Sequence, residues 1–295
     1  MRFDTGLLPQ ETARYLRETL PDAELNYRHR PGIATVYQGR AIAFNALGLR
    51  ERPLGPKQPG EVRIVILGDS VVFGWGVADQ DTFGRQLERD LGRLSKRPIR
   101  TVNTGVCSYN TVQQLRYLRR SGAQLEPDVV LLVYVENDVQ PFLPVDRSGS
   151  MLAVRGRPGR LADWLLAHSW TYRVAYHLSR PYLVGETLDP ASVGYRESMQ
   201  ALAGLSAASR ELGARFAVVV YRMARRPASD RLASDIADVG QAHGFPVADA
   251  APWFAGRDLR ALTNSLTDTH PNAAGHAILA LGAAELLVRN RMLER

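Results

Sequence analysis

The chain has 295 residues, of which 45% are hydrophobic and 23% charged, and its formal net charge is +7. This is ordinary globular composition with enough residues for a large core, and no repeat or low-complexity segment is visible. The positive charge is nearly all arginine, since lysine occurs only at Lys57 and Lys96. Without a lysine-rich run or a nucleic-acid motif, no nucleic-acid partner is expected.

The compartment is inferred from cysteine usage and from targeting segments. Cys107 is the single cysteine, so no intramolecular disulfide is possible. The N-terminal residues lack the basic-then-apolar pattern of a signal peptide, and no apolar run reaches the roughly 18 residues of a membrane span. A cytoplasmic protein without an integral membrane segment is expected, whose oligomeric state the sequence leaves unknown.

Residues 1–60 are expected to form an N-terminal extension that packs on the core. A weak helical signal covers 11–20, and turns rich in proline and glycine follow at 30–32 and 53–60. The stretch 43–50 reads Ala-Phe-Asn-Ala-Leu-Gly-Leu-Arg. Packing on the sheet edge is one interpretation of this stretch, and a direct role at the functional site is the other.

From residue 61 the chain alternates between strand and helix patterns, which predicts a parallel sheet covered by helices on both faces. Strands are expected at 62–67, 99–103, 129–135, 215–221 and 246–249, and helices at 82–94, 111–121, 193–212, 229–243 and from just after Pro271 to about 291, with a loop or short helix at 254–266. We therefore expect residues 61–295 to form one α/β domain, flavodoxin-like, with three layers and a sheet of about five strands.

The alternation is interrupted over about 141–190. A segment rich in glycine and arginine at 155–160 precedes an amphipathic segment that contains Trp164 and Trp170. The stretch is too long for a plain connection, so a helical insertion is expected. It is interpreted either as a lid over the site or as a packing element.

Three short motifs follow the predicted elements. Gly68-Asp69-Ser70 ends the first strand, so Ser70 stands past a carboxyl end, where open α/β sheets place their ligands. The same residue types also form ordinary turns. Asn137-Asp138 follows another apolar strand, and Asp268-Thr269-His270-Pro271-Asn272 lies near the C-terminus.

These motifs, in this order, resemble the blocks of the SGNH (GDSL) hydrolases, in the bacterial GDSL-like lipase/acylhydrolase branch. The similarity extends from about residue 45 to about residue 287, and the stretch 43–50 resembles an N-x-x-G-[LF]-R segment of that branch. The resemblance implies the SGNH hydrolase fold and acyl transfer through an acyl-serine intermediate.

A serine hydroxyl needs an adjacent base, and the base needs a group that fixes its tautomer. Ser70 is the candidate nucleophile, and His270 is the candidate base because it enters a helix from a loop beside an acid. Asp268 is the candidate acid, although it precedes the histidine by two residues where the family usually has three. Alternatively, Asp268 caps the last helix and a backbone carbonyl orients His270; Asp249 and Asp258 are rival acids.

The resemblance also implies an oxyanion hole made by the backbone N–H of Ser70, a second backbone N–H and the Asn137 side chain. The second donor is usually a glycine, and Ser108 stands at that position. Its N–H serves if its φ is negative. No metal cluster, dinucleotide fingerprint or phosphate loop is visible, so neither a metal nor a cofactor is expected.

The expected reaction is ester hydrolysis that removes acetyl or short acyl groups from a carbohydrate or a small metabolite. One alternative is an O-acyltransferase with the same Ser-His-Asp site, which a closed aromatic lid over 160–180 would favour. The other is a non-catalytic binding module on an SGNH scaffold, which the irregular motifs favour and the presence of Ser70, Asn137 and His270 opposes.

Overall fold

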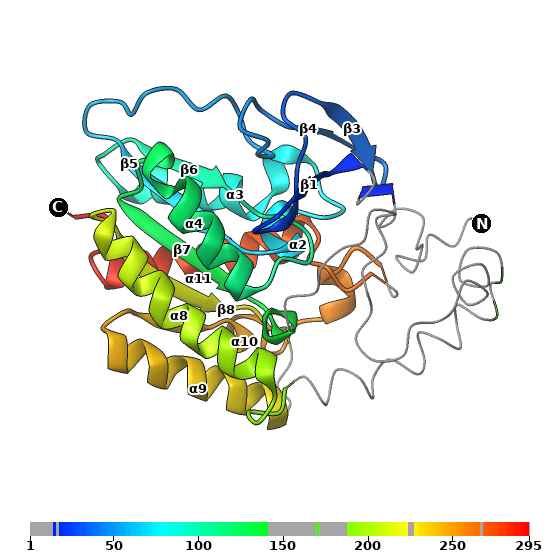
Figure 1. Cartoon of the computed structure of the whole chain (residues 1–295), viewed down its shortest axis with the longest axis vertical. Helices are drawn as coiled ribbons and strands as arrows, with labels where there is room; N and C mark the ends of the chain where they lie inside the picture. Colours follow the sequence, from blue (N-terminus) through cyan, green and yellow to red (C-terminus); the bar gives the residue numbers. More distant parts are fainter. Residues whose placement is uncertain are drawn as a thin grey trace.

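The computed structural model describes residues 14–15, 18–140, 169, 171, 188–223, 227–265 and 268–294. A five-stranded parallel sheet forms its centre, in the strand order β6-β5-β7-β8-β9 (Figure 1). The strands are β5 (Val62–Leu67), β6 (Ile99–Asn103), β7 (Val129–Tyr134), β8 (Arg215–Val220) and β9 (Val247–Asp249). The predicted α/β fold with about five parallel strands is confirmed.

The two central strands show why an apolar run predicts this sheet. Every residue of β5 and β7 is buried, since helices cover both faces of a parallel sheet. β5 pairs with β6 on one side and with β7 on the other. The chain therefore goes from β5 to β6 in one direction across the sheet and then crosses back past β5 to reach β7. Such a switch point opens a crevice at the carboxyl ends of the two strands, which here are β5 and β7.

Helices pack on the two faces as separate layers (Figure 1). The helices α4 (Thr111–Leu125), α8 (Val193–Glu211) and α9 (Pro227–His243) share one apolar cluster with the sheet, and α3 (Phe83–Leu94) and α11 (Ala273–Arg289) share the other. The short elements are α2 (Ser70–Phe73), α10 (Ala251–Phe254) and the 3-10 helices η1 (Asp79–Asp81), η2 (Glu136–Val139) and η3 (Leu259–Leu262).

The helix boundaries differ from the sequence-based expectation by up to four residues. α4 runs to Leu125 rather than to 121, and it starts with a capping box between Asn110 and Gln113. The last helix begins at Ala273 because the Asn272 side chain accepts hydrogen bonds from the first-turn amides. Pro271 stands before this helix and forms an isolated β-bridge with Thr263.

The N-terminal segment contains two antiparallel hairpins where the sequence indicated only turns. They are β1 (Leu20–Asp22) with β2 (Asn26–Arg28), and β3 (Ala34–Tyr37) with β4 (Arg40–Ala43). Their aromatic side chains cluster with residues that follow Ser70, and the hairpins lie beside α2 in Figure 1. The helical signal at 11–20 falls partly outside the described residues, and the division at residue 60 stays a prediction.

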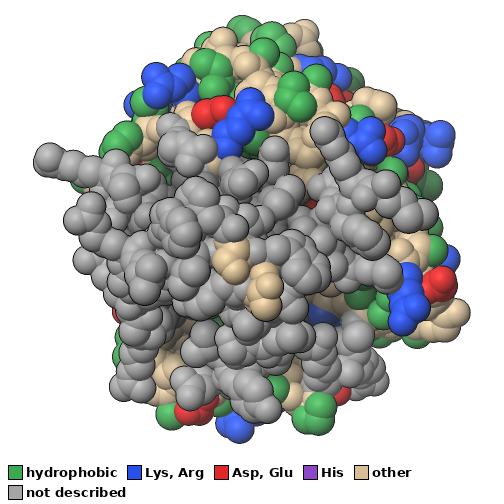
Figure 2. All heavy atoms as spheres, turned by 90° about the vertical axis from the view of Figure 1, so that its right-hand side faces the viewer, with side chains coloured by type: hydrophobic (Ala, Val, Ile, Leu, Met, Phe, Trp, Pro, Cys, Tyr) green, Lys and Arg blue, Asp and Glu red, His purple; other side chains and the backbone are tan. Residues whose placement is uncertain are grey.

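The predicted insertion at 141–190 lies almost entirely outside the described residues. No helix in the ranges given above has the length and apolar character needed to cross a bilayer. Figure 2 views the molecule from the right-hand side of Figure 1. On the described rim of that face, basic, acidic and hydrophobic side chains lie interspersed.

Candidate active site

Ser70 is the first residue of α2, directly after the carboxyl end of β5. The strand turns sharply into the helix at Gly68, where a Cβ atom would lie 2.4 Å from the Val72 side chain. Asp69 caps the helix, since its Oδ1 accepts a hydrogen bond of 2.9 Å from the Val71 amide. The glycine and the cap together fix the Ser70 side chain at the crevice between β5 and β7.

His270 precedes Pro271, and hydrogen bonds join Asn264 and Ser265 to the segment that begins at Asp268. The Asn264 amide donates to the His270 carbonyl at 3.0 Å, and the Asp268 amide donates to the Ser265 hydroxyl at 3.0 Å. Asp268 is buried, whereas Thr269 is exposed. The His270 amide donates to Asp268 Oδ1 at 3.1 Å, so the Asp268 carboxylate folds back toward His270 despite their two-residue spacing.

The side chains of Ser70, His270 and Asp268 form one chain of contacts. Ser70 Oγ lies 2.9 Å from His270 Nε2, and His270 Nδ1 lies 2.5 Å from Asp268 Oδ1. An ionised carboxylate only accepts, so Nδ1 carries the proton and Nε2 is left as a base facing Ser70. The rival acids lie elsewhere: Asp249 pairs with Arg222, and Asp258 caps η3.

Asp268 is held ionised by its neighbours. Burial acts to raise the pKa of its carboxyl, but hydrogen bonds from the His270 side chain and amide and from Asn264 outweigh burial, and the pKa is lowered. Asn264 Nδ2 donates both to Asp268 Oδ2 at 3.2 Å and to the Trp75 carbonyl at 2.9 Å. This amide links the acid to the segment that follows Ser70.

Asn137 reaches the same crevice from η2, just past the end of β7. Its Nδ2 donates a hydrogen bond of 3.0 Å to Asp69 Oδ2. A side-chain amide carries two N–H groups, and this hydrogen bond uses one of them. Asp69 Oδ2 also lies 3.2 Å from Ser70 Oγ, a contact that competes for the one hydroxyl proton with the shorter contact to His270.

The comparison of sequences identifies the family. The family model described as GDSL-like lipase/acylhydrolase matches residues 66–278. The chain belongs to this family. The match begins in β5 just before Ser70 and ends in α11 just after His270, so it contains all five candidate site residues. No curated protein sequence matches the chain.

Solved structures of low sequence identity share the fold of this GDSL family member. LAE5, described as an alpha/beta hydrolase enzyme from the metagenome of Lake Arreo, Spain, has a TM-score of 0.51 at 17% identity, covering 79% of this chain and 97% of its own. The Clostridium thermocellum family 3 carbohydrate esterase has a TM-score of 0.50 at 13% identity, covering 78% of this chain and 96% of its own. The psychrotrophic esterase EstA from Pseudoalteromonas sp. has a TM-score of 0.50 at 16% identity, covering 78% of this chain and 98% of its own.

Ser108 departs from the condition set by the sequence analysis. Its φ is +64°, in the left-handed region, where a residue other than glycine is strained by about 1–3 kcal/mol. The neighbouring amides hold this conformation, since Cys107 N donates to the Tyr15 hydroxyl and Tyr109 N donates to the Val106 carbonyl. Ser108 thus has the backbone that a glycine would adopt, and its role as a donor stays a prediction.

Three further residues support this GDSL site: Asn264, which no motif indicated, and Arg50 and Asp138, which end the stretch 43–50 and the Asn137-Asp138 motif but were assigned no role of their own. Asn264 and Arg50 contact backbone carbonyls after Ser70, and Asp138 accepts hydrogen bonds from Gln114 at 3.0 Å and from the Val135 amide at 2.8 Å. Burial, followed by the charge of Asp69, raises the pKa of Asp138 well above its ordinary value.

Among the described residues no group of three His, Cys, Asp or Glu side chains is arranged to hold a metal ion.

Proposed function

We propose that this GDSL family member is a serine ester hydrolase that works through an acyl-serine intermediate. Family membership supports a hydrolase. The observation that carries the finer proposal is the continuous contact from Ser70 Oγ to His270 Nε2 and from His270 Nδ1 to Asp268, at 2.9 and 2.5 Å. In this order the three groups are suited to activating a hydroxyl.

The first half of the reaction acylates the enzyme. Ser70 Oγ attacks the ester carbonyl carbon while His270 Nε2 takes the hydroxyl proton. The resulting oxyanion accepts hydrogen bonds from the Ser70 amide, the Asn137 side chain and, in our proposal, the Ser108 amide. The C–O bond to the alcohol then breaks, and the alcohol leaves with the proton from His270.

The second half restores the enzyme. A water molecule attacks the acyl-serine carbonyl and gives a proton to His270 Nε2. The C–O bond to Ser70 breaks, Ser70 recovers that proton, and a carboxylic acid is released. Asp268 stays ionised throughout and stabilises the imidazolium that forms in each half.

We propose an acetyl or short-acyl ester of a carbohydrate or a small metabolite as the substrate. The carbohydrate esterase among the structural neighbours supports this class. An O-acyltransferase would use the same residues with an alcohol in place of water. We favour hydrolysis because the family is described by acylhydrolase activity.

The test uses nitrophenyl esters of increasing acyl length together with a phosphonate probe. EstA has a structure described as inhibited by monoethylphosphonate, which supports this choice of probe. We expect hydrolysis that is fastest with short acyl groups, phosphonate attached to Ser70 by mass spectrometry, and a loss of at least about 10³-fold in kcat for Ser70→Ala. Ester transfer to added alcohols in preference to water would support the acyltransferase.

A folded protein that neither hydrolyses these esters nor reacts with the phosphonate would overturn the proposal and support a binding module instead. Retention of more than about a tenth of the wild-type kcat by Ser70→Ala would also overturn it. The fold of Ser70→Ala is checked by thermal unfolding, because the substitution removes one half-buried hydroxyl and should leave the core unchanged.

A further inference from the structure

The helix that carries Ser70 is only four residues long, and it leaves its last carbonyl groups without partners inside the helix. Side chains from other segments bind those carbonyls and the ones that follow. Asn103 Nδ2 donates to the Val72 carbonyl at 2.8 Å, and Asn264 Nδ2 donates to the Trp75 carbonyl at 2.9 Å. Side chains of other segments therefore hold the short helix that carries Ser70 and the loop after it.

Arg50 binds more of these carbonyls than any other described side chain. Its Nη1 donates to the carbonyls of Phe73 at 3.0 Å and Gly74 at 2.6 Å, and its Nη2 donates to the carbonyl of Val77 at 2.7 Å. Its guanidinium carbon also lies 5.2 Å from the centre of the Phe73 ring. The planar fork of one guanidinium thus spans the end of α2 and the loop after it.

The Arg50 side chain is buried, with 2% of its surface exposed. Burial lowers the pKa of its guanidinium to about 10, which leaves it charged at neutral pH. A buried charge costs several kcal/mol unless polar groups replace its water. Here the replacements are two carbonyls at the negative end of the helix that carries Ser70 and one in the loop after it, so the charge and the turn stabilise one another.

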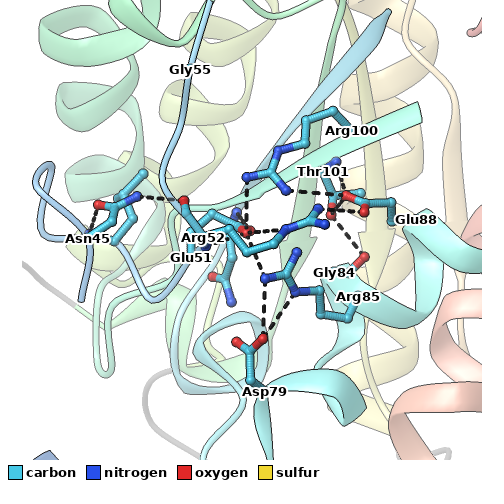
Figure 3. A network of polar contacts seen from close by, with 12 residues as sticks. Asn45, Glu51, Arg52, Gly55, Asp79, Gly84, Arg85, Glu88, Arg100 and Thr101 are labelled. Carbon is cyan, nitrogen blue, oxygen red and sulfur yellow. Dashed lines mark hydrogen bonds and ion pairs between the residues drawn. The ribbon is translucent and has the colours of Figure 1, made fainter. Parts of the chain in front are cut away.

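The segment before and after Arg50 is rigid enough to hold the guanidinium in place. Asn45 Oδ1 accepts hydrogen bonds from the amides of Leu47 and Leu49 at 2.9 and 3.0 Å, which folds a compact turn. Glu51 is buried in a network with Arg85 at 3.1 Å and Arg100 at 3.3 Å (Figure 3). This network fixes the segment to α3 and β6.

We propose that Arg50 is a positioning residue. By binding the carbonyls of Phe73, Gly74 and Val77, it sets the distance and orientation of the Ser70 hydroxyl relative to His270 Nε2. The proposal rests on the ester hydrolase proposed above. It gives the N-terminal extension a part in catalysis, since the segment that supplies Arg50 precedes β5. A displacement of about 1 Å at such a group can cost about 10²-fold in rate.

The test compares Arg50→Lys and Arg50→Met with Arg63→Lys. Arg63 is the matched control, because it is equally buried on β5 but pairs with Glu61 at 2.7 Å, at the end of the strand opposite Ser70. Each rate is divided by the concentration of folded enzyme and is measured at a temperature below the unfolding midpoint of that variant. We expect kcat to fall about 10-fold in Arg50→Lys and about 10²-fold in Arg50→Met, with KM within about threefold.

Arg63→Lys should lower the unfolding midpoint while keeping kcat within about twofold. If the Arg50 variants lose stability to the same extent but keep the wild-type kcat, Arg50 only supports the fold and the proposal is overturned. Should Arg50→Met fail to fold, Arg50→Lys alone decides between these outcomes, because it retains the charge and loses the fork.

A crystal structure of Arg50→Lys separates this proposal from the proposed function. We expect the Ser70 Oγ to His270 Nε2 separation to exceed hydrogen-bond range, about 3.5 Å. An unchanged separation overturns the role of Arg50 even if the wild type is an esterase. A displaced Ser70 supports that role even if the wild type hydrolyses no ester, in which case only the proposed function fails.

Discussion

His276 makes the stability of this protein depend on pH in a way that can be worked out from the structure. It lies on α11 with no exposed surface, and neither ring nitrogen has a hydrogen-bond partner among the described residues. Burial, with smaller contributions from the charges of Arg50 and His270, lowers its pKa to about 3. The folded protein therefore keeps His276 neutral.

The magnitude follows from the difference between the folded and unfolded states. An unfolded histidine has a pKa of about 6.5, so above that pH neither state binds the proton and stability is unaffected. Below it the unfolded state binds a proton that the folded state refuses, and stability is lost progressively until about pH 3. Between pH 8 and pH 5 the loss is about 2 kcal/mol for this one residue.

The assay is urea unfolding of wild type and His276→Leu at pH 8 and pH 5. The pH 8 values measure the change in packing, because His276 is uncharged in both states there. On going to pH 5 we expect His276→Leu to lose about 2 kcal/mol less than wild type. Burial also lowers the pKa of His29 to about 3. His276→Leu should therefore still lose a similar amount of stability between pH 8 and pH 5 because of His29.

Equal losses in the two proteins, within about 0.5 kcal/mol, would refute the reasoning. Such a result would mean that His276 accepts a proton in the folded state, either through a rearrangement of α11 or through a partner that stabilises the imidazolium. Because only the difference between the two proteins is used, every other group that titrates between pH 8 and pH 5 cancels.

Three further predictions concern the site. Asp268→Asn should lower kcat about 10³- to 10⁴-fold with little change in the unfolding midpoint, because an amide favours the wrong tautomer of His270; a loss under tenfold would exclude this role. Asn137→Ala should lower kcat about 10²- to 10³-fold, and Asn137→Asp should be as damaging because a carboxylate repels the oxyanion; near-normal rates would reduce Asn137 to a turn residue. Ser108→Gly should raise the free energy of unfolding by up to about 1 kcal/mol and keep kcat within twofold, since the amide is retained; a large loss of stability in urea would contradict the strain inferred from its φ.

Much of the fold could be predicted because burial leaves a pattern in the sequence. The runs that became β5 and β7 are apolar at every position except Arg63, as expected for strands covered on both faces. The N-terminal hairpins left no such pattern. Their strands are three or four residues long and none has more than one buried residue, so only the prolines and glycines near them gave a signal, which indicated turns.

The candidate site could be predicted where its residues follow strands in short motifs. Ser70 and Asn137 come after adjacent strands, and His270 stands in a motif with its acid, so their meeting follows from the topology. The supporting contacts could not be predicted, since Arg50 and Asn264 bind backbone carbonyls 23 and 189 residues away. A carbonyl is present at every residue, so such contacts leave no trace in composition or periodicity.

The convergence of Ser70 and His270, which are 200 residues apart, has a kinetic consequence. His270 lies just before α11, and α11 packs on α3 in an apolar cluster that both helices share with β5. Contacts between distant parts of a chain form late, because the loop between them must first be closed at an entropic cost. During refolding from denaturant, the early spectroscopic signals should report the sheet and its local helices. Recovery of catalytic turnover should be the last signal to return, and its delay measures how late α11 joins the rest.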